Sequence, residues 1–452
     1  MMKKIAAILL MILMAGAVFV GCTKPDIKYE SGSVNSGISW EESLASGTSS
    51  GGASSVPLSE NQIVIWADPN DDSVKAAIKN FEAKRPDVKV KLENSSTTDI
   101  EAIQRALSSG QAPDILRLDH VYVTGFGNKG NMIDLSKYGA KDIADKFIAP
   151  CWEAVSHNGA VYGIPGDANT IGFMYNADML KAAGKTVNDL KTYEGLKATA
   201  NAMKAASPSK TPITFPFFDT ANQGRESWVS PVLMHWLWSE GGEILSPDLK
   251  TAVFNQQEGI DAFNRVISFS REKLTQNQYM EPGFYRGEVG MIEMGCWAIP
   301  SLISNTHGQN LGVTTRPASK AGIPGYSMLG MYAWGVTKNK AKTTKPRSEE
   351  LNQVCFDFLE TFLTDDSIQV AWARKNNFLP TTKTAINNSY FTSSPVWNVF
   401  VKQVQITKSR PGVTNWLQIE GLLAKAINEA VSTKNVPNAL NSAAARVNEL
   451  LK

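Results

Sequence analysis

The hydrophobic pattern between residues 62 and 119 predicts alternating strands and helices. The run Gln-Ile-Val-Ile-Trp-Ala at 62–67 is short, apolar and β-branched, which is typical of a buried strand. A helical spacing of apolar residues follows, and Pro86 ends that helix. The expected elements are strands over 62–67, 88–92 and 112–116, and helices over 71–85 and 99–109. This order predicts a parallel sheet that is covered by helices.

The same reading extends to the rest of the chain. Residues 170–329 have their own alternation of helices and strands, and further helices are expected over 348–364, 368–376, 420–430 and 436–451. In parallel sheets, ligands bind outside the carboxyl ends of the strands. Trp66 and Asp68 follow the first strand, and Asp119 and His120 follow the third. These four residues are therefore candidates for a ligand-binding site.

The N-terminus has the pattern of a secretory signal. Lys3 and Lys4 precede an uncharged apolar run from Ile5 to Val20, which is too short for an ordinary spanning helix. The run ends in Gly21-Cys22, which resembles the bacterial lipobox, in which the Cys is acylated and becomes the new N-terminus. We therefore expect a signal peptide over 1–21 and lipidation of Cys22. The alternative is an ordinary signal peptide in which this Cys is incidental.

Residues 22–59 are expected to be a lipidated tether. Between Ser31 and Ser55, 15 of 25 residues are Ser or Gly, a composition that buries too little apolar surface to fold. Cleavage before Cys22 removes two lysines and leaves 43 residues of each charge sign. A net charge of zero excludes a polybasic membrane surface and argues against binding to nucleic acid. Attachment to the membrane would come from the acyl chains.

Seven segments carry a resemblance to a known family, in the family's order. They are Ile63-Val-Ile-Trp66, Phe81-Glu-Ala-Lys-Arg-Pro-Asp-Val-Lys-Val90, Gly110-Gln-Ala-Pro-Asp-Ile115, Asn158-Gly-Ala-Val-Tyr-Gly-Ile-Pro165, Phe173-Met-Tyr-Asn176, Gly290-Met-Ile-Glu-Met-Gly-Cys-Trp297, and Arg410-Pro411 with Trp416. With them, the chain resembles the extracellular solute-binding proteins of bacterial ABC sugar transporters, the family that includes maltodextrin-binding protein. The likeness extends over nearly all of residues 60–452.

The resemblance implies a two-lobe α/β fold of the periplasmic-binding-protein type (type II-like), with the ligand cleft between the lobes. Lobe 1 would comprise 60–169 and 330–377, and lobe 2 would comprise 170–329 and 378–452. Three crossings between the lobes are expected near 169–170, 330–332 and 377–380. Ligand binding would close this hinge.

The resemblance also implies a function. The protein would be a membrane-tethered extracytoplasmic receptor, in the periplasm or on the outer face of the cytoplasmic membrane. It would capture a sugar or oligosaccharide and deliver it to the permease subunits of an ABC importer. It would act as a monomer without enzymatic activity, cofactor or metal.

Aromatic candidates for the sugar site come from four places. The resemblance assigns stacking on the sugar to Trp297, which follows Gly295, and to Trp416. Trp66 at a strand end and Tyr332 at the second crossing are further candidates. For the three tryptophans the alternative is an ordinary place in the core.

Polar candidates would bind sugar hydroxyls. Besides Asp68, Asp119 and His120, these are Asp167 and Asn169 at the first crossing and Glu293 in the strand before Gly295. Asp167 and Asn169 have an alternative role as caps of a following helix, and Asp71 is the equivalent capping candidate beside Asp68.

The other tryptophans and the cysteines are expected to be structural. Packing roles are predicted for Trp152, Trp334, Trp372 and Trp397 and for at least one of Trp236 and Trp238, whereas the role of Trp228 stays open. Cys151, Cys296 and Cys355 have apolar neighbours and are expected to be buried thiols, although pairing between them stays open. With only four His and four Cys in the chain, a His/Cys metal enzyme is not expected.

Two other functions compete with sugar capture. The same fold could bind a polyamine, a peptide-like solute or an anion, with Asp68, Asp119, Asp167 and Glu293 as the carboxylates of a polyamine site. A secreted glycoside hydrolase would need two carboxylates flanking the scissile bond. The sequence contains no phosphate-binding Gly-x-x-x-x-Gly-Lys-(Ser/Thr) loop, and residues 60–452 contain no Gly-x-Ser-x-Gly elbow.

Overall fold

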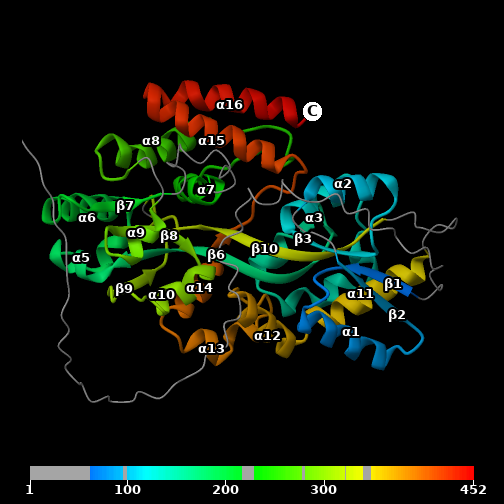
Figure 1. Ribbon diagram of the computed structural model, residues 1–452. Coiled ribbons are helices and arrows are strands. Elements are labelled where there is room, and N and C mark those ends of the chain that lie inside the picture. The colour runs from blue at the N-terminus through cyan, green and yellow to red at the C-terminus, as the bar shows by residue number, and fades with distance from the viewer. Residues whose placement is uncertain (1–61, 95–98, 216–228, 277–279, 321, 339–347) are drawn as a thin grey trace, which may run out of the picture. The chain divides into compact units, whose positions relative to one another are not determined.

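A computed structural model of the chain describes residues 62–94, 99–215, 229–276, 280–320, 322–338 and 348–452 (Figure 1). These residues lie in the second of two units, 53–452, while the first unit is 1–52. The predicted signal peptide, Cys22 and the tether lie outside the described residues, as does Trp228.

The strands are β1 (Gln62–Trp66), β2 (Lys89–Glu93), β3 (Ile115–Asp119), β4 (Ser156–His157), β5 (Ala160–Val161), β6 (Ile164–Asn176), β7 (Thr211–Thr214), β8 (Val289–Gly295), β9 (Leu311–Thr314), β10 (Ser327–Val336) and β11 (Thr407–Lys408). Nine of these strands form one mixed sheet whose main path has the order β2-β1-β3-β10-β6-β8-β7, with β11 beside β10 and β9 beside β6. β4 and β5 form a separate two-stranded sheet.

The α-helices are α1 (Asp72–Lys84), α2 (Ile100–Ser109), α3 (His120–Asn128), α4 (Ala149–Glu153), α5 (Ala177–Ala182), α6 (Tyr193–Ala206), α7 (Val229–Glu240), α8 (Gln257–Arg271), α9 (Glu281–Tyr285), α10 (Ile299–Ile303), α11 (Glu349–Leu363), α12 (Asp366–Asn376), α13 (Ser389–Thr392), α14 (Trp397–Val404), α15 (Trp416–Thr433) and α16 (Val436–Leu450). Short 3₁₀ turns occur over Leu135–Tyr138, Ala140–Lys146, Val187–Lys191, Cys296–Ala298 and Ala385–Asn387.

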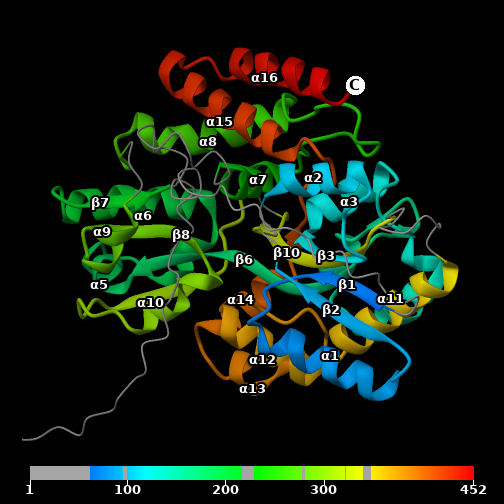
Figure 2. The ribbon, with the colours of Figure 1, turned by 45° about the vertical axis from the view of Figure 1, so that its right-hand side comes forward.

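The first half of the sheet confirms the sequence prediction. β1 pairs in parallel with both β2 and β3, as the strand–helix–strand pattern requires. Figures 1 and 2 show α2 and α3 on one face of this part of the sheet and α1, α11 and α12 on the other. The carboxyl ends of β1 and β3 therefore lie at the same edge of the sheet, with Trp66 and Asp119 as their last residues.

Capping side chains explain where the helices begin. The carboxylate of Asp71 accepts hydrogen bonds from the backbone N–H groups of Ser73 and Val74, at 2.8 and 3.2 Å, and so begins α1. Asp99 caps α2 in the same way, and the hydroxyl of Ser348 accepts from Leu351 at the start of α11. Such caps satisfy backbone donors that a helix leaves unpaired. Asp71 thus has the capping role.

Two long strands continue through the middle of the sheet (Figure 1). The first part of β6 pairs with β10 and its second part pairs with β8 and β9. β10 in turn pairs with β3 near its end and with β11 near its start. β10 pairs antiparallel with both β3 and β6, and β6 pairs antiparallel with β8. Because β1 pairs in parallel with its neighbours, the sheet as a whole is mixed. β6 and β10 connect the part of the sheet around β1 to the part around β8.

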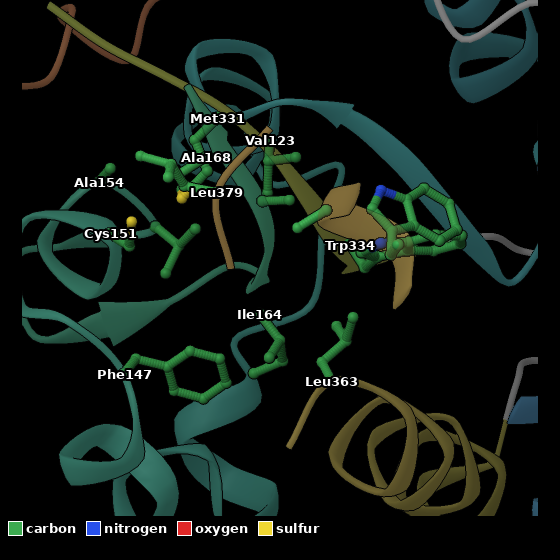
Figure 3. Packing of buried hydrophobic residues seen from close by; sticks show 14 of the residues in the cluster. Val123, Phe147, Cys151, Ala154, Ile164, Ala168, Met331, Trp334, Leu363 and Leu379 are labelled. Carbon is green, nitrogen blue, oxygen red and sulfur yellow. The ribbon is translucent and has the colours of Figure 1, made fainter. Parts of the chain in front are cut away.

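The three segments predicted as crossings lie side by side at this point. Ala168 is opposite Met331 in the β6–β10 ladder. It also forms an antiparallel bridge with Leu379, in which the N–H of Ala168 donates to the oxygen of Leu379 at 2.9 Å and the N–H of Leu379 donates to the oxygen of Ala168 at 2.7 Å. Figure 3 shows Ala168, Met331 and Leu379 together, above Cys151 and beside Val123. All three residues are buried.

The core confirms most of the packing predictions. Trp236, Trp238, Trp334, Trp372 and Trp397 are buried, and Cys151, Cys296 and Cys355 are buried free thiols. Trp152 is half-buried, and its ring stacks on Phe147 with centroids 5.5 Å apart. α15 and α16 pack on each other and on α8, and they contribute a second hydrophobic cluster together with α7. In the described part of the chain, no helix is long and apolar enough to cross a membrane.

A buried ion pair joins β8 to the segment after β9. The Nη2 atom of Arg316 donates to Oε1 of Glu293 at 2.6 Å, and neither side chain has exposed surface. Burial raises the pKa of Glu293 to about 7, although Arg316 acts in the opposite direction. Because this pKa exceeds the ordinary value of 4.5, the folded protein binds the proton more tightly than the unfolded chain. The contribution to stability is complete below about pH 4.5 and is lost as the pH rises through 7.

Replacing Glu293 by Gln should remove this pH dependence. Relative to E293Q, the free energy of unfolding of the wild type should fall by on the order of 3 kcal/mol between pH 4.5 and 7.5, since each pKa unit is worth about 1.4 kcal/mol. Urea unfolding at several pH values measures this difference. The exposed Glu288 is a matched control, because Arg286 lowers its pKa and E288Q should give the opposite trend. Parallel pH profiles for wild type and E293Q would contradict the prediction.

Candidate ligand-binding site

Three neighbouring strands place Asp119, Tyr332 and Asp167 in one row. Tyr332 of β10 is directly opposite Asp119 of β3 on one side and Asp167 of β6 on the other. Residues at directly opposite positions have side chains on the same face, close enough to interact. The row lies at the carboxyl end of β3, where ligands of such sheets bind. Sequence analysis selected all three residues but had no means of placing them in one row.

Arg117 completes this row and was missed by the sequence analysis. It lies two residues before Asp119 on β3, so its side chain is on the same face. Its Nη2 atom donates to Oδ2 of Asp167 at 2.6 Å, and its guanidinium lies 3.9 Å from the ring centroid of Tyr332. The alternation Leu-Arg-Leu-Asp at the end of the strand was the signal that could have identified it.

Asp167 is a buried carboxylate with two strong donors. Besides Arg117, the indole Nε1 of Trp372 donates to its Oδ2 atom at 2.6 Å, and only 1% of Asp167 is exposed. Within the described residues, Oδ1 of Asp167 and Nε of Arg117 have no hydrogen-bond partner. The cluster therefore contains one unpaired acceptor atom and one unpaired donor atom, both of them buried. The alternative role of Asp167 as a helix cap is wrong, because β6 continues to Asn176, which caps α5 itself.

A second ion pair holds Asp119. Nη2 of Arg410, from the segment between β11 and α15, donates to Oδ2 of Asp119, while Oδ1 accepts from the backbone N–H of Val121 at 3.1 Å. Burial raises the pKa of Asp119, but the opposing effects of Arg410 and then His120 are together larger. The pKa of Asp119 therefore lies well below its ordinary value. Asp119 is therefore ionised at physiological pH.

His120 is fixed by the same strand end. Its Nδ1 atom lies 3.2 Å from the backbone oxygen of Met331 and 3.2 Å from Oδ1 of Asp119. Because both neighbours are acceptors, Nδ1 carries the proton. Nε2 has no partner within the described residues, and the ring is 1% exposed. His120 therefore orients Asp119 and the adjoining strand, and it does not present a surface to solvent.

We call Arg117, Asp119, Asp167, Tyr332 and Arg410 the strand-end cluster. The other four residues all act electrostatically on the phenol of Tyr332, and its pKa is raised, chiefly by burial. Each carboxylate of the cluster has its own guanidinium, so the formal charges cancel. Tyr332 is half-buried, and it supplies an aromatic ring with a hydroxyl between the two ion pairs.

The tryptophan candidates have different surroundings. Trp66 is half-buried, and its Nε1 donates to Glu93 at 3.1 Å. Trp297 is also half-buried and packs over Gly295, where a Cβ atom would lie 1.9 Å from the indole. Trp416 is 1% exposed and belongs to the hydrophobic cluster around α15, so it has no open face in this conformation.

The remaining polar candidates are spread out. Asp68 is exposed and accepts from the backbone N–H of Asn70 at 2.8 Å. Asn169 is half-buried beside Gly330, where a Cβ atom would lie 2.0 Å from its Oδ1. Glu293 is enclosed with Arg316, as described above, so its carboxylate is committed to a structural ion pair.

A pocket of about 600 Å³ lies next to the strand-end cluster. Its volume is in the range of small-molecule sites. The lining comes from α3, from 153–157, from 238–258 and from 409–412, and it includes Glu153, His157, Trp238, Glu258 and Arg410. None of the eleven residues predicted to bind the ligand lines this pocket, which meets the cluster only through Arg410. In the described residues, no group of three or more His, Cys, Asp and Glu side chains could hold a metal ion.

Comparison with known proteins identifies the family. Residues 76–397 match the family of bacterial extracellular solute-binding proteins. The chain is 29% identical to a maltotriose-binding protein of Pyrococcus abyssi over 134 residues, which are 29% of each chain. It is 29% identical to the maltodextrin-binding protein MdxE of Bacillus subtilis over 152 residues, 33% of this chain and 36% of that one. The chain thus spans about a third of the length of the curated relatives it matches.

A solved structure has the same fold. The cyclic alpha-maltosyl-1,6-maltose binding protein of Arthrobacter globiformis superposes with a TM-score of 0.74 and 22% identity, over 86% of this chain and 99% of that chain. This likeness establishes the mixed α/β fold of that structure for the present chain. Because the family match extends over well over half of the chain, the protein belongs to the bacterial extracellular solute-binding proteins, which act outside the cytoplasm.

Proposed function

We propose that the protein captures a sugar or oligosaccharide outside the cytoplasm and delivers it to the permease subunits of an ABC importer. The names of the relatives point to glucose polymers, since they bind maltotriose, maltodextrin and a cyclic maltosyl-maltose. The single observation that carries the proposal for this chain is the charge balance of the strand-end cluster.

This charge balance favours a neutral ligand that offers hydroxyl groups. Asp119 is paired with Arg410 and Asp167 with Arg117, which leaves the aromatic ring of Tyr332 and single donor and acceptor atoms. A sugar hydroxyl both donates and accepts, so it can satisfy such atoms where they are otherwise unpaired. Rings such as those of Tyr332 and Trp297 suit the apolar C–H faces of a sugar.

Most of the carboxylates that a polyamine site would need are already paired with arginines. Three of the four that it needs are paired with arginines, namely Asp119, Asp167 and Glu293. A polyamine would have to displace these guanidiniums, and among the four only the exposed Asp68 forms no ion pair with an arginine within the described residues. A hydrolase is disfavoured too, because the lowered pKa of Asp119 is opposite to what a general acid needs, and Glu293, whose pKa is raised, is enclosed with Arg316 and has no exposed surface. We therefore propose a binding protein without catalytic activity.

Ligand capture would proceed by closure of two lobes, with 60–169 and 330–377 in lobe 1 and 170–329 and 378–452 in lobe 2. The contact of Ala168 with Met331 and Leu379 supports this division, because the three proposed crossings then form one hinge. A hinge of this kind confines the dihedral changes to a few residues. We expect the protein to work as a monomer.

The N-terminal sequence supports an anchored receptor. The proposal is that Cys22 is acylated after cleavage and that 23–59 is a flexible tether to the membrane. Retention at the surface would then come from the acyl chains.

A sugar panel tests the proposed function. At a ligand concentration of about 100 times Kd, binding should stabilise the folded protein by about 2.7 kcal/mol and raise its melting temperature. The panel should include maltotriose, longer maltodextrins, cyclic glucans and monosaccharides, with spermidine as the competing class. A shift with spermidine alone, or no shift with any sugar, would refute sugar capture.

Trp297 is expected to stack on the sugar. Trp297→Ala should weaken binding by about 1–2 kcal/mol, roughly tenfold or more in Kd, because a truncated aromatic anchor loses its contact area. Trp152→Ala is the matched control, since Trp152 is also half-buried but stacks on Phe147. Calorimetry with the sugar found in the panel measures both variants. Equal Kd values for wild type and W297A would remove Trp297 from the site.

Cys22 is expected to be the anchor. Cys22→Ser should abolish incorporation of labelled palmitate and move the protein from the membrane fraction to the medium or periplasm. Cys355→Ser is the control, because this thiol is buried and should not be acylated. Membrane retention of the C22S protein would contradict the lipid anchor.

A further inference from the structure

We propose that Arg410 is a latch that holds the two lobes together in the ligand-free protein. The inference rests on the proposed function for the lobe boundaries and for the meaning of closure. It concerns the ion pair between Arg410 and Asp119, which joins the end of β3 to the segment before α15. By the proposed boundaries, Asp119 belongs to lobe 1 and Arg410 to lobe 2.

Arg410 has one partner on each side. Nη2 donates to Asp119 across the proposed lobe boundary, whereas Nη1 lies 4.0 Å from Oε1 of Glu420, on α15 in the same lobe. The side chain of Arg410 is 11% exposed and that of Glu420 is 4% exposed. Because Glu420 moves with Arg410, the guanidinium keeps a carboxylate when the lobes separate. Opening would take Arg410 away from Asp119, but Asp119 keeps the hydrogen bond from the backbone N–H of Val121 and its contact with His120. Neither side chain is then left as an unpaired buried charge, which is the costly outcome for most buried ion pairs.

The segment around Arg410 fits closely on α3. A Cβ atom on Gly125 would lie 3.0 Å from the backbone nitrogen of Thr414, and one on Gly412 would lie 2.8 Å from Cβ of Thr124. The two glycines thus allow the backbones to approach. The Asn128 side chain adds a hydrogen bond to the backbone oxygen of Gly412 at 3.3 Å. The ion pair is the charged centre of a contact that otherwise consists of small groups.

The adjacent pocket gives the guanidinium room to move. Its walls come from lobe 1, at Thr124 and 153–157, and from lobe 2, at 238–258 and 409–412. Arg410 lines this pocket, and its Nε has no hydrogen-bond partner within the described residues. Because the guanidinium adjoins open volume, it can separate from Asp119 while it keeps its contact with Glu420. This is the two-state element that a latch requires.

The latch makes a directional prediction for the conformational equilibrium. Without the pair with Asp119, the ligand-free protein should spend more time open. Apparent affinity falls in proportion to the fraction of binding-competent molecules, so a tenfold smaller closed fraction gives a Kd about tenfold higher. A residue with a merely structural role would lower the melting temperature without changing the distance between the lobes.

The test is a distance measurement between the lobes. Spin labels are attached at Lys79→Cys on α1 and Lys181→Cys on α5, two exposed positions, in the full chain carrying Cys22→Ser. The three other cysteines are buried and should not react. In Arg410→Gln and in Asp119→Asn, we expect a longer-distance population to appear in the ligand-free protein, and Kd for the sugar to rise about tenfold. Arg410→Lys should give an intermediate population, because lysine keeps the positive charge but lacks the planar, forked set of N–H donors of the guanidinium.

Controls separate the latch from the proposed function. Arg286→Gln breaks an exposed pair with Glu288 and should leave the distances unchanged. Asp119→Asn leaves Arg410 its Glu420 partner, so it decides the question if R410Q fails to fold. If R410Q and D119N, or whichever of them folds, have the same ligand-free distance distribution as the wild type, the latch proposal is wrong. The distances in the ligand-free protein test the latch even if no sugar binds. In that case the proposed function would be wrong, and the latch would still be judged from these distances.

Discussion

The antiparallel pairing of β6 with β10 is the interaction on which the rest of the structure depends. Both strands are continuous through the middle of the sheet, and each pairs with different partners at its two ends. Backbone hydrogen bonds in the interior of a sheet cannot be lost without cost. The pairing therefore joins the part around β1 to the part around β8 while it confines any relative movement to a few residues. Leu379 extends the same contact to the third crossing segment.

Charge pairing is the second constraint, and it defines the chemistry of the strand-end cluster. Carboxylates and guanidiniums that leave water must be paired, because the loss of hydration costs several kcal/mol for each ion. Asp167 and Asp119 meet this requirement with Arg117 and Arg410, and Glu293 does so with Arg316. The first two pairs adjoin Tyr332, whereas the third is enclosed in the core. Similar residue types thus have different roles, depending on whether a half-buried ring lies beside them.

The proposed hinge and the strand-end cluster occupy neighbouring positions on the same strands. Asp167 is one residue before Ala168, and Tyr332 is one residue after Met331. A ligand that contacts the cluster would therefore act directly beside the point about which the lobes move. Ligand binding could then be coupled to lobe closure without a pathway through the core. The residues proposed to contact the ligand are adjacent, in sequence and in the sheet, to the residues of the proposed hinge. Arg410 adds a contact from the other lobe to the same place.

The sequence by itself determined the local elements and their order. Helix 348–364 and strand 62–67 were predicted within a residue or two, because capping side chains, Pro86 and the spacing of apolar residues act over a few positions. The parallel pairing of β1 with β2 and β3 followed from the same local pattern. The family resemblance then predicted three crossing segments, and tertiary contacts bring these segments side by side.

Only the tertiary structure decided the partners of the polar residues. Arg117 and Asp167 are 50 residues apart, and Asp119 and Arg410 are 291 apart, so no local pattern connects them. The same holds for the core position of Trp416 and for the burial of Glu293, since a strand with apolar neighbours on both sides does not reveal which face its single charge occupies. Sequence patterns report the few residues around a position, whereas burial and ion pairing depend on which distant segment covers it.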